Sequence, residues 1–549
     1  MATQTTGGGS TTSFSNTPQA KDDLYSWTEN ALALSSYYNV ATRIVTFDVM
    51  SNDLGGNAKT LFSVDDGNGN ALAPDAQLLV ADPLTGGISA WEKTALNNWV
   101  RINNGKVEYK LDNGGAAAAG RDLNTLSATD QINDVFVYAI RLGNGTLSQA
   151  RVLINIQGEN DGATITGTYT GTVVEAGGTS NSTPGTPTVT GTLTVTDVDA
   201  GENHFQNPSA AALTGTYGNF TFNSTTGAWS FTLDNAKPAT EALAAGQIVH
   251  QTLTVISADG TTSRTIDVTI TGSNDAPVIT VQDLIGAVTE QVTPAGNLTD
   301  SGTISFSDVD LTDVHLVSLT GTPVGTTLGS LSAVKNSDTT GTGTGGQLTW
   351  TYTVADSAVE YLAAGQTKVE SFTITLNDQN GGVITKQIDV TITGTNDGPN
   401  IILVTTDTAS TSLVETNAGL SGSGTLSVTD ADVSDTVSSL VTTVVTSGTT
   451  TGLGLTNGQL LTMLGVTPAD LAADPTDTHN LTWNFNSGTQ AFDYLAVGEQ
   501  LVLTYTVKST DSSTSPLSDT QTVTVTITGS NDAPVVSAAV VATVDEDDA

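Results

Sequence analysis

The sequence predicts an all-β chain, built as a tandem array of antiparallel β-sandwich domains. One phrase recurs as IQGENDGA, ITGSNDAP, ITGTNDGP and ITGSNDAP, and its Asp residues, at positions 161, 275, 397 and 532, lie 114, 122 and 135 residues apart. Each spacing is the length of one β-sandwich, and a fixed period marks like domains in series. Apolar and polar residues also alternate strictly, as in TIDVTITG at 265–272, which is typical of half-buried antiparallel strands.

The recurring phrase also sets the expected domain limits. Residues 1–20 are rich in Gly, Ser and Thr and predict a flexible arm. After the arm we expect a divergent first domain, three like repeats and the start of a further repeat, at 21–162, 163–276, 277–398, 399–533 and 534–549. Because the last stretch repeats the opening of a block, we expect the natural chain to continue.

The three like repeats share one internal order. An apolar strand leads to a Glu, and the next strand runs into an acidic D-x-D turn that another acid follows three residues later. A Trp strand, a compact LAAG-like element and two strands in hairpin order complete the repeat. Only the LAAG element has a pattern that fits a helical turn. We interpret the three repeated Trp residues as core anchors rather than platforms for sugar stacking: Trp229, Trp350 and Trp483.

Charge and composition exclude several classes of partner. The chain has 56 Asp and Glu against 16 Lys and Arg, a formal net charge of -40, so we expect neither nucleic acid nor an anionic membrane as a partner. Such a polyanion repels itself when folded, and bound divalent cations would neutralise it. The absence of Cys excludes disulfides and thiolate metal sites and favours an extracellular location. No stretch has the length of a membrane span, and the first 20 residues lack the pattern of a secretory signal.

The acids recur at similar distances around each linker. From the linker Asp to the next Glu there are 14, 15 and 18 residues, and from the same Asp to the D-x-D turn there are 36, 33 and 33. Ca²⁺ takes six to eight oxygen ligands, many of them carboxylates. The D-x-D spacing directs both carboxylates to one side of an extended segment. The pattern therefore predicts calcium between consecutive domains, although Asn-Asp-Ala-Pro is also a turn sequence that needs no metal.

The TGxNDxP phrase, the D-V-D turn and the YLAAGQ element resemble the VCBS and cadherin-like repeats of giant secreted bacterial adhesins of the RTX type. The resemblance covers 163–549 well and 21–162 less well. It implies Ca²⁺ held by an early Glu, a mid-domain acid, the linker Asn-Asp, and the D-x-D turn and late Asp of the next domain. The first junction would use Glu29, Asn160, Asp161, Asp197, Asp199 and Asp259. The second would use Glu175, Glu241, Asn274, Asp275, Asp308, Asp310 and Asp378, and the third Glu290, Glu360, Asn396, Asp397, Asp430, Asp432 and Asp511. The fourth shows only its upstream half: Glu415, Asp493, Asn531 and Asp532.

One departure from the repeat pattern agrees with this assignment. The first domain has Asn144 where the later domains carry the late Asp, and that Asp would serve a junction with a preceding domain. The family's mid-domain motif carries two neighbouring acids, and here only one aligns.

These patterns favour a non-enzymatic extracellular rod, stiffened by Ca²⁺, in a bacterial surface protein that serves adhesion or biofilm formation. The resemblance implies export in one step with a C-terminal address, and copies of itself or a surface glycan are the expected partners. A self-assembling S-layer or filament subunit is the alternative. A carbohydrate-binding or carbohydrate-cleaving protein is a further alternative, which an aromatic cleft near Trp91 or Trp99 would favour. No Ser/His/Asp order, phosphate loop or zinc signature indicates an enzyme. We expect exposed or incidental roles for the four histidines, with no shared repeat position: His204, His250, His315 and His479.

Overall fold

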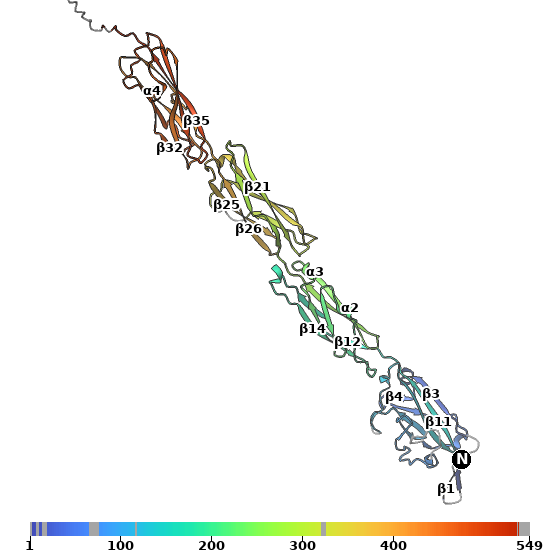
Figure 1. The fold of residues 1–549 in the computed structure, drawn as a ribbon. Coiled ribbons are helices and arrows are strands. Elements are labelled where there is room, and N and C mark those ends of the chain that lie inside the picture. Colours follow the sequence, from blue (N-terminus) through green and yellow to red (C-terminus); the bar gives the residue numbers. More distant parts are fainter. Residues whose placement is uncertain are drawn as a thin grey trace, which may run out of the picture. The chain divides into compact units, whose positions relative to one another are not determined.

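The computed structural model describes residues 3–6, 10–13, 19–64, 76–115, 118–319, 325–534 and 536, whose elements are mostly β-strands (Figure 1). The chain forms two compact units, Met1–Gly177 with Asn181–Ser273, and Gly178–Ser180 with Asn274–Ala549. Each unit contains two β-sandwiches, which confirms the predicted fold class. The expected arm at 1–20 and further repeat at 534–549 lie largely outside the described residues. Within the arm, strands β1 (Thr3–Thr6) and β2 (Ser10–Ser13) pair antiparallel.

The first sandwich packs a four-stranded sheet against a five-stranded sheet. The first sheet has the order β3 (Asp23–Thr28), β11 (Leu147–Gln157), β10 (Gln131–Arg141) and β6 (Thr60–Val64). The second has the order β4 (Tyr38–Asn39), β5 (Ile44–Phe47), β9 (Lys106–Lys110), β8 (Trp99–Asn103) and β7 (Glu92–Lys93). Alternating side chains such as Val152, Ile154 and Ile156 fill the space between the sheets.

The second sandwich belongs to the same unit and has a core of its own. One sheet has the order β12 (Thr164–Gly167), β14 (Thr188–Thr196), β16 (Ala228–Leu233) and β15 (Gly218–Phe222). The other has the order β13 (Thr170–Val174), β18 (Ser263–Thr271) and β17 (Ile248–Ile256). Ile266, Val268 and Ile270 all face the core, as their alternation predicted.

The third sandwich lies in the second unit. Its first sheet has the order β19 (Val278–Gln282), β21 (Asn297–Ser307), β24 (Gly346–Ala355) and β23 (Ser330–Ser337). Its second has the order β20 (Ile285–Thr289), β26 (Val383–Thr393), β25 (Thr367–Asn377) and β22 (Leu316–Leu319).

The fourth sandwich completes that unit. Its first sheet has the order β27 (Asn400–Ile402), β29 (Ser421–Thr429), β33 (Leu481–Asn486) and β31 (Leu464–Thr467). Its second has the order β28 (Ser410–Val414), β35 (Ser518–Thr528), β34 (Gln500–Thr510), β30 (Thr436–Gly448) and β32 (Asp470–Ala472).

One pairing recurs in all four sandwiches. The strand that leads to the early Glu lies parallel to the last strand of its domain, as β3 does beside β11 (Figure 1). Each early Glu therefore lies beside the end of the last strand, where the Asn-Asp linker begins. In the first, third and fourth domains the fold thus brings two acids that are more than 100 residues apart in sequence to the same end of the domain.

A Trp and a Gly anchor the strand that enters each D-x-D turn. Trp229, Trp350 and Trp483 are at most 3 % exposed, which confirms them as core residues. Each indole Nε1 donates a hydrogen bond to a backbone carbonyl, of Thr168, Asp283 and Thr408 respectively. A Cβ on Gly302 would lie 2.5 Å from Cζ2 of Trp350, so the ring requires a glycine beneath it.

Helices are short and few in the part of the chain that the structure describes. They are α1 (Glu29–Ala33), α2 (Ala210–Leu213), α3 (Pro238–Glu241) and α4 (Asn457–Leu461). The predicted helical turn lies just before the LAAG element, in α3 and in a 3₁₀ turn at Asp356–Ala358. Among the described residues, none of the helices has the length and apolar character needed to cross a membrane.

Candidate metal centres

Each D-x-D turn is fixed by two backbone hydrogen bonds. Oδ1 of the first Asp accepts the N–H of the second, at 2.9, 3.0 and 3.1 Å for Asp197, Asp308 and Asp430. Oδ2 of the second Asp accepts the N–H of the linker Asp, at 2.9, 2.8 and 2.9 Å for Asp199, Asp310 and Asp432. One oxygen of each carboxylate therefore holds the backbone, and the linker is tied to the turn of the next domain.

The other oxygens of these acids are buried and, with one exception, lack a hydrogen-bond partner. Across the D-x-D turns these atoms are Oδ2 of Asp197, Oδ1 of Asp199, Oδ1 of Asp310, Oδ2 of Asp430 and Oδ1 of Asp432. The late Asp259 and the upstream acids contribute more: Asp161, Glu290, Glu360, Asp397 and Glu415. Since a buried carboxylate oxygen is costly unless it is paired or binds a metal, these atoms mark positions where a cation would be stabilising.

The acids gather into two kinds of triad. The downstream triad joins the first D-x-D Asp, the acid five residues later and the late Asp, as Asp197–Glu202–Asp259 and Asp308–Asp313–Asp378. The upstream triad joins the early Glu, the mid-domain acid and the linker Asp, as Glu290–Glu360–Asp397 and Glu415–Asp493–Asp532. Within each triad the ligand atoms lie within 4.8 Å of one another.

The linker Asn and the early Glu position these triads. Nδ2 of the Asn donates to Oδ2 of the late Asp, at 3.3 Å from Asn160 to Asp259 and at 3.0 Å from Asn396 to Asp511. Asn274 makes the same bond to Asp378, at 2.9 Å. The amide oxygens of Asn274 and Asn396 are left without a hydrogen-bond partner. The early Glu accepts a backbone N–H from the end of the last strand, as Glu290 does from Thr395 at 2.8 Å.

The electrostatics of the clusters are unfavourable without a cation. Burial, together with the carboxylates of Asp313 and Asp275, raises the pKa of Asp310 to about 8. Burial and the neighbouring acids likewise raise the pKa of Glu290 to about 8 and that of Asp432 to about 7. A divalent cation among these groups would favour their ionised forms.

The donor set fits a hard divalent cation. All the unpartnered atoms of these clusters are carboxylate or amide oxygens, which Ca²⁺ and Mg²⁺ prefer, and no thiolate occurs in the chain. The many converging carboxylates suit the larger ligand number of Ca²⁺ better than Mg²⁺, which keeps most of its water. What the arrangement can do is join two adjacent domains through one ion.

Most of the sequence-predicted ligands lie in these clusters. At the first junction Asn160 contacts Asp259 and Asp161 contacts Asp199. Burial, together with the carboxylates of Asp161 and Asp199, raises the pKa of Glu29 to about 7. At the third, the upstream triad and the turn meet through the hydrogen bond from Asp397 to Asp432. The second predicted set spans the two compact units, with Glu175 and Glu241 in one and its other five residues in the other. Within their own unit Glu175 accepts a hydrogen bond from Ser273 N and Glu241 accepts one from Asn181 Nδ2. Asn531 of the fourth set is exposed.

The predicted ligand set omitted one repeated acid. Glu202, Asp313 and Asp435 each follow the first D-x-D Asp by five residues, and each has a buried oxygen without a hydrogen-bond partner. Glu202 and Asp313 complete the two downstream triads. Their constant offset was visible in the sequence and was the signal that could have identified them.

The first domain contains an altered copy of the same turn. Asp48-Val49-Met50 follows β5, and Asp53 lies five residues after Asp48. Met50 replaces the second Asp, and Asp53 already accepts hydrogen bonds from Lys21 N at 2.7 Å and from the Tyr138 hydroxyl at 3.1 Å. The carboxylate of Asp53 thus has hydrogen-bond partners within its own domain, in agreement with Asn144 at the late-Asp position. A turn of this kind therefore does not by itself leave carboxylate oxygens without partners.

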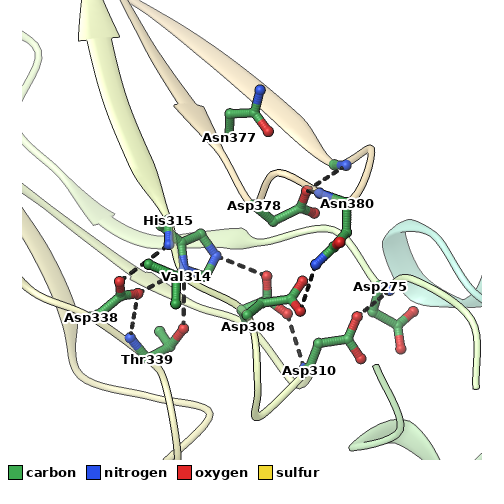
Figure 2. A network of polar contacts seen from close by, with 12 residues as sticks. Asp275, Asp308, Asp310, Val314, His315, Asp338, Thr339, Asn377, Asp378 and Asn380 are labelled. Atoms are coloured by element: carbon green, nitrogen blue, oxygen red, sulfur yellow. Dashed lines mark hydrogen bonds and ion pairs between the residues drawn. The ribbon is translucent and has the colours of Figure 1, made fainter. Parts of the chain in front are cut away.

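The expectation for the histidines was wrong in two respects. His204 and His315 do share a repeat position, seven residues after Asp197 and Asp308 respectively. His204 is exposed, but His315 is only 2 % exposed. Figure 2 shows the imidazole of His315 between Asp308 and Asp338, with Nε2 2.9 Å from Asp308 Oδ2 and Nδ1 2.7 Å from Asp338 Oδ1. Burial disfavours the charged ring, but the hydrogen bonds with both carboxylates raise the pKa of His315.

No family model and no curated protein matches this chain. Among solved structures, the protocadherin gamma B2 extracellular cadherin domains 1–5 are similar at 13% identity and a TM-score of 0.39, over 94% of this chain and 80% of that one. Drosophila N-cadherin EC1-4 has 15% identity and a TM-score of 0.23, over 93% and 99%. The human desmocollin-1 ectodomain has 11% identity and a TM-score of 0.23, over 94% and 81%. Because these TM-scores are low, the assignment of tandem β-sandwiches rests on the sheets of this chain itself.

Proposed function

We propose that this chain is part of an extracellular bacterial surface protein, a non-enzymatic array of β-sandwiches whose junctions are stiffened by Ca²⁺ and which serves adhesion. One observation carries the proposal. In each repeat the second Asp of the D-x-D turn uses one oxygen to hold the N–H of the linker Asp and leaves the other buried without a hydrogen-bond partner, as Asp199, Asp310 and Asp432 do. An acid repeated in every domain suits a structural role better than a single active site.

The mechanism is linkage between ion binding and domain order. Without Ca²⁺ the clustered carboxylates repel one another, and the linker between two domains is held only by its hydrogen bonds. Outside cells Ca²⁺ is millimolar, and extracellular modules bind it with Kd values of about 10⁻⁴–10⁻³ M. A site filled at a tenfold excess over Kd stabilises the folded form by about 1.4 kcal/mol. Several such ions would resist bending at every junction.

Calcium binding by the intact chain is the test. Equilibrium dialysis with radioactive Ca²⁺ should show several bound ions per chain, and Mg²⁺ at the same concentration should displace few of them. Melting temperature and the maximum dimension from small-angle X-ray scattering should both rise from chelator to Ca²⁺. Unchanged dimensions and melting in the two buffers would refute the proposal, and self-association in Ca²⁺ alone would favour the alternative of an S-layer or filament subunit.

A second candidate, carbohydrate binding, is favoured by one hollow in the first domain. The hollow has a volume of about 550 Å³ and is lined by Trp91, Arg101 and Lys110, with Thr42 and Ile44 beside them. The guanidinium carbon of Arg101 lies 4.2 Å, and Nζ of Lys110 4.5 Å, from the centroid of the Trp91 ring. Arg101 is paired with Glu108 at 2.6 Å and Nζ of Lys110 donates to Ala118 O at 2.6 Å, so the candidate rests on the Trp91 ring rather than on these charges. A glycan array with the parent chain and the variant Trp91→Ala would decide, since binding lost in the variant supports this candidate and no binding by the parent excludes it for the glycans present.

A further inference from the structure

The downstream cluster that contains Asp308 differs from its counterparts in one atom. Oδ1 of Asp308 holds the turn, as in the other repeats, but Oδ2 is paired with Nε2 of His315 at 2.9 Å. The equivalent Oδ2 atoms of Asp197 and Asp430 are buried and have no hydrogen-bond partner. The oxygen that remains free elsewhere is therefore occupied here by a side chain of the protein.

The residue at the same offset explains the difference between repeats. Seven residues after the first D-x-D Asp stand His204, His315 and Val437. His204 is exposed, and Oδ2 of Asp197 has no hydrogen-bond partner, so the pairing that His315 makes is absent there. Val437 is 1 % exposed and belongs to the hydrophobic core of its domain. Only the third sandwich combines an imidazole with burial at this position.

The ring of His315 is held firmly in place. Its side chain and that of Asp308 are fully enclosed. Asp338 accepts from Nδ1 at 2.7 Å and from His315 N at 3.1 Å, and its own carboxylate is held by Thr339 N at 2.9 Å and by the Lys335 ammonium. The Phe306 ring packs against the imidazole with a centroid distance of 4.9 Å. Figure 2 shows this chain of contacts running from Asp338 through His315 to Asp308.

We propose that His315 occupies the cation-facing oxygen of Asp308, so that the triad Asp308–Asp313–Asp378 binds a divalent cation more weakly than the triad Asp197–Glu202–Asp259. The inference rests on the proposed function. A Ca²⁺ ligand oxygen must lie about 2.3–2.6 Å from the ion, and the Nε2–H group directs its positive end into that space. An ion must displace the enclosed ring or bind without Oδ2 of Asp308 as a ligand. The cluster still offers buried oxygens without hydrogen-bond partners, Oδ2 of Asp313 and Oδ1 of Asp310, so it remains a site, but a weaker one.

The test compares His315→Val with its matched control His204→Val in the full chain. Val is the residue of the next repeat at this offset, so the substitution reproduces a natural solution. Equilibrium dialysis with radioactive Ca²⁺ should show one binding equivalent whose Kd is about tenfold lower in His315→Val than in the parent, and His204→Val should match the parent. Coincident isotherms for His315→Val and a Ca²⁺-binding parent would overturn the inference while leaving the proposed function intact. No bound Ca²⁺ in the parent would overturn both.

A second variant keeps the inference testable if His315→Val does not fold, as judged by its melting curve. Asp338→Ala removes the acceptor of Nδ1 and frees the ring to leave Asp308. A simple count of charges predicts weaker Ca²⁺ binding after loss of this carboxylate, whereas release of Asp308 predicts tighter binding at one equivalent. Tighter binding supports the inference, and unchanged or weaker binding overturns it.

Discussion

Replacing Asp432 by Asn should change stability in opposite directions with and without Ca²⁺. Asp432 is fully buried, its Oδ2 accepts the N–H of Asp397 at 2.9 Å, and its Oδ1 has no hydrogen-bond partner. An Asn can still accept that N–H through its amide oxygen. Its NH₂ group then replaces the unpartnered oxygen and faces the remaining carboxylates. The variant therefore keeps the backbone contact and removes the charge.

The size of both effects can be estimated. In chelator at about pH 8 the carboxyl is ionised, and a pKa raised to about 7 limits the cost of that charge to about 4 kcal/mol. Because burying the amide of Asn also costs free energy, the expected gain for Asp432→Asn is about 1–2 kcal/mol. In Ca²⁺ the variant loses a charged ligand, and each tenfold loss of affinity costs about 1.4 kcal/mol, so we expect a loss of about 1–3 kcal/mol.

Hydrogen exchange in the full chain measures the effect locally, at the peptides that carry the amides of Asp397 and Asp432. Exchange should be slower than in the parent in chelator and faster in Ca²⁺. Asp470→Asn is the matched control, because Asp470 is an exposed acid on β32 of the same domain, and it should change neither condition. A variant that exchanges faster in both buffers would mean that Asp432 acts only in packing, and the reasoning would be wrong.

Three further predictions concern other parts of the chain. Asp313→Asn should weaken Ca²⁺ binding at one equivalent about tenfold in calorimetry, because Asp313 completes the downstream triad beside Asp378, and an unchanged isotherm would remove it from the ligand set. Burial raises the pKa of Asp23 to about 7, above its unfolded value of about 3.9. The contribution of Asp23 to the free energy of unfolding is therefore fully present below about pH 4 and is lost as the pH rises through 7. Denaturation of the first unit at about pH 5 and pH 8 should show this fall, and Asp23→Asn should reduce it while leaving the share of Glu29, whose pKa burial also raises to about 7. Gly302→Ala should cost about 1–3 kcal/mol in thermal unfolding, because its Cβ would overlap the Trp350 ring, whereas Gly465→Ala, with open space around its Cβ, should be nearly neutral.

The fold could be predicted from the sequence because its signals are local and repeated. Alternation in TIDVTITG places Ile266, Val268 and Ile270 on one face without reference to the rest of the chain. The repeated Trp on the strand after the turn identified a core residue in three domains at once. The helical turn lies before the LAAG element rather than within it. In the second domain α3 begins at Pro238, because a Pro is well suited to the first position of a helix.

The site could be predicted only in part, because a ligand set depends on which oxygens remain free. The spacing of the acids located the D-x-D turns and the linkers, but it could not show that Oδ1 of Asp308 holds a backbone N–H while Oδ2 faces His315. His315 is held by Asp338 and Lys335, which lie 23 and 20 residues further along the chain. The same is true of Asp53, whose two oxygens are taken by Lys21 and Tyr138 from distant segments.

The division of labour within each carboxylate ties the fold to the ion. Because one oxygen of Asp199 or Asp432 holds the linker N–H, the turn and the linker meet before any ion binds, and the cost of ordering the loop is already met in the folded chain. The other oxygen is left buried among like charges, and a bound divalent cation would relieve that repulsion. The junction is therefore preorganised but destabilised, which is the condition under which binding an ion changes stiffness rather than fold. His315 shows the converse case, in which the protein supplies its own donor and the dependence on the ion should fall.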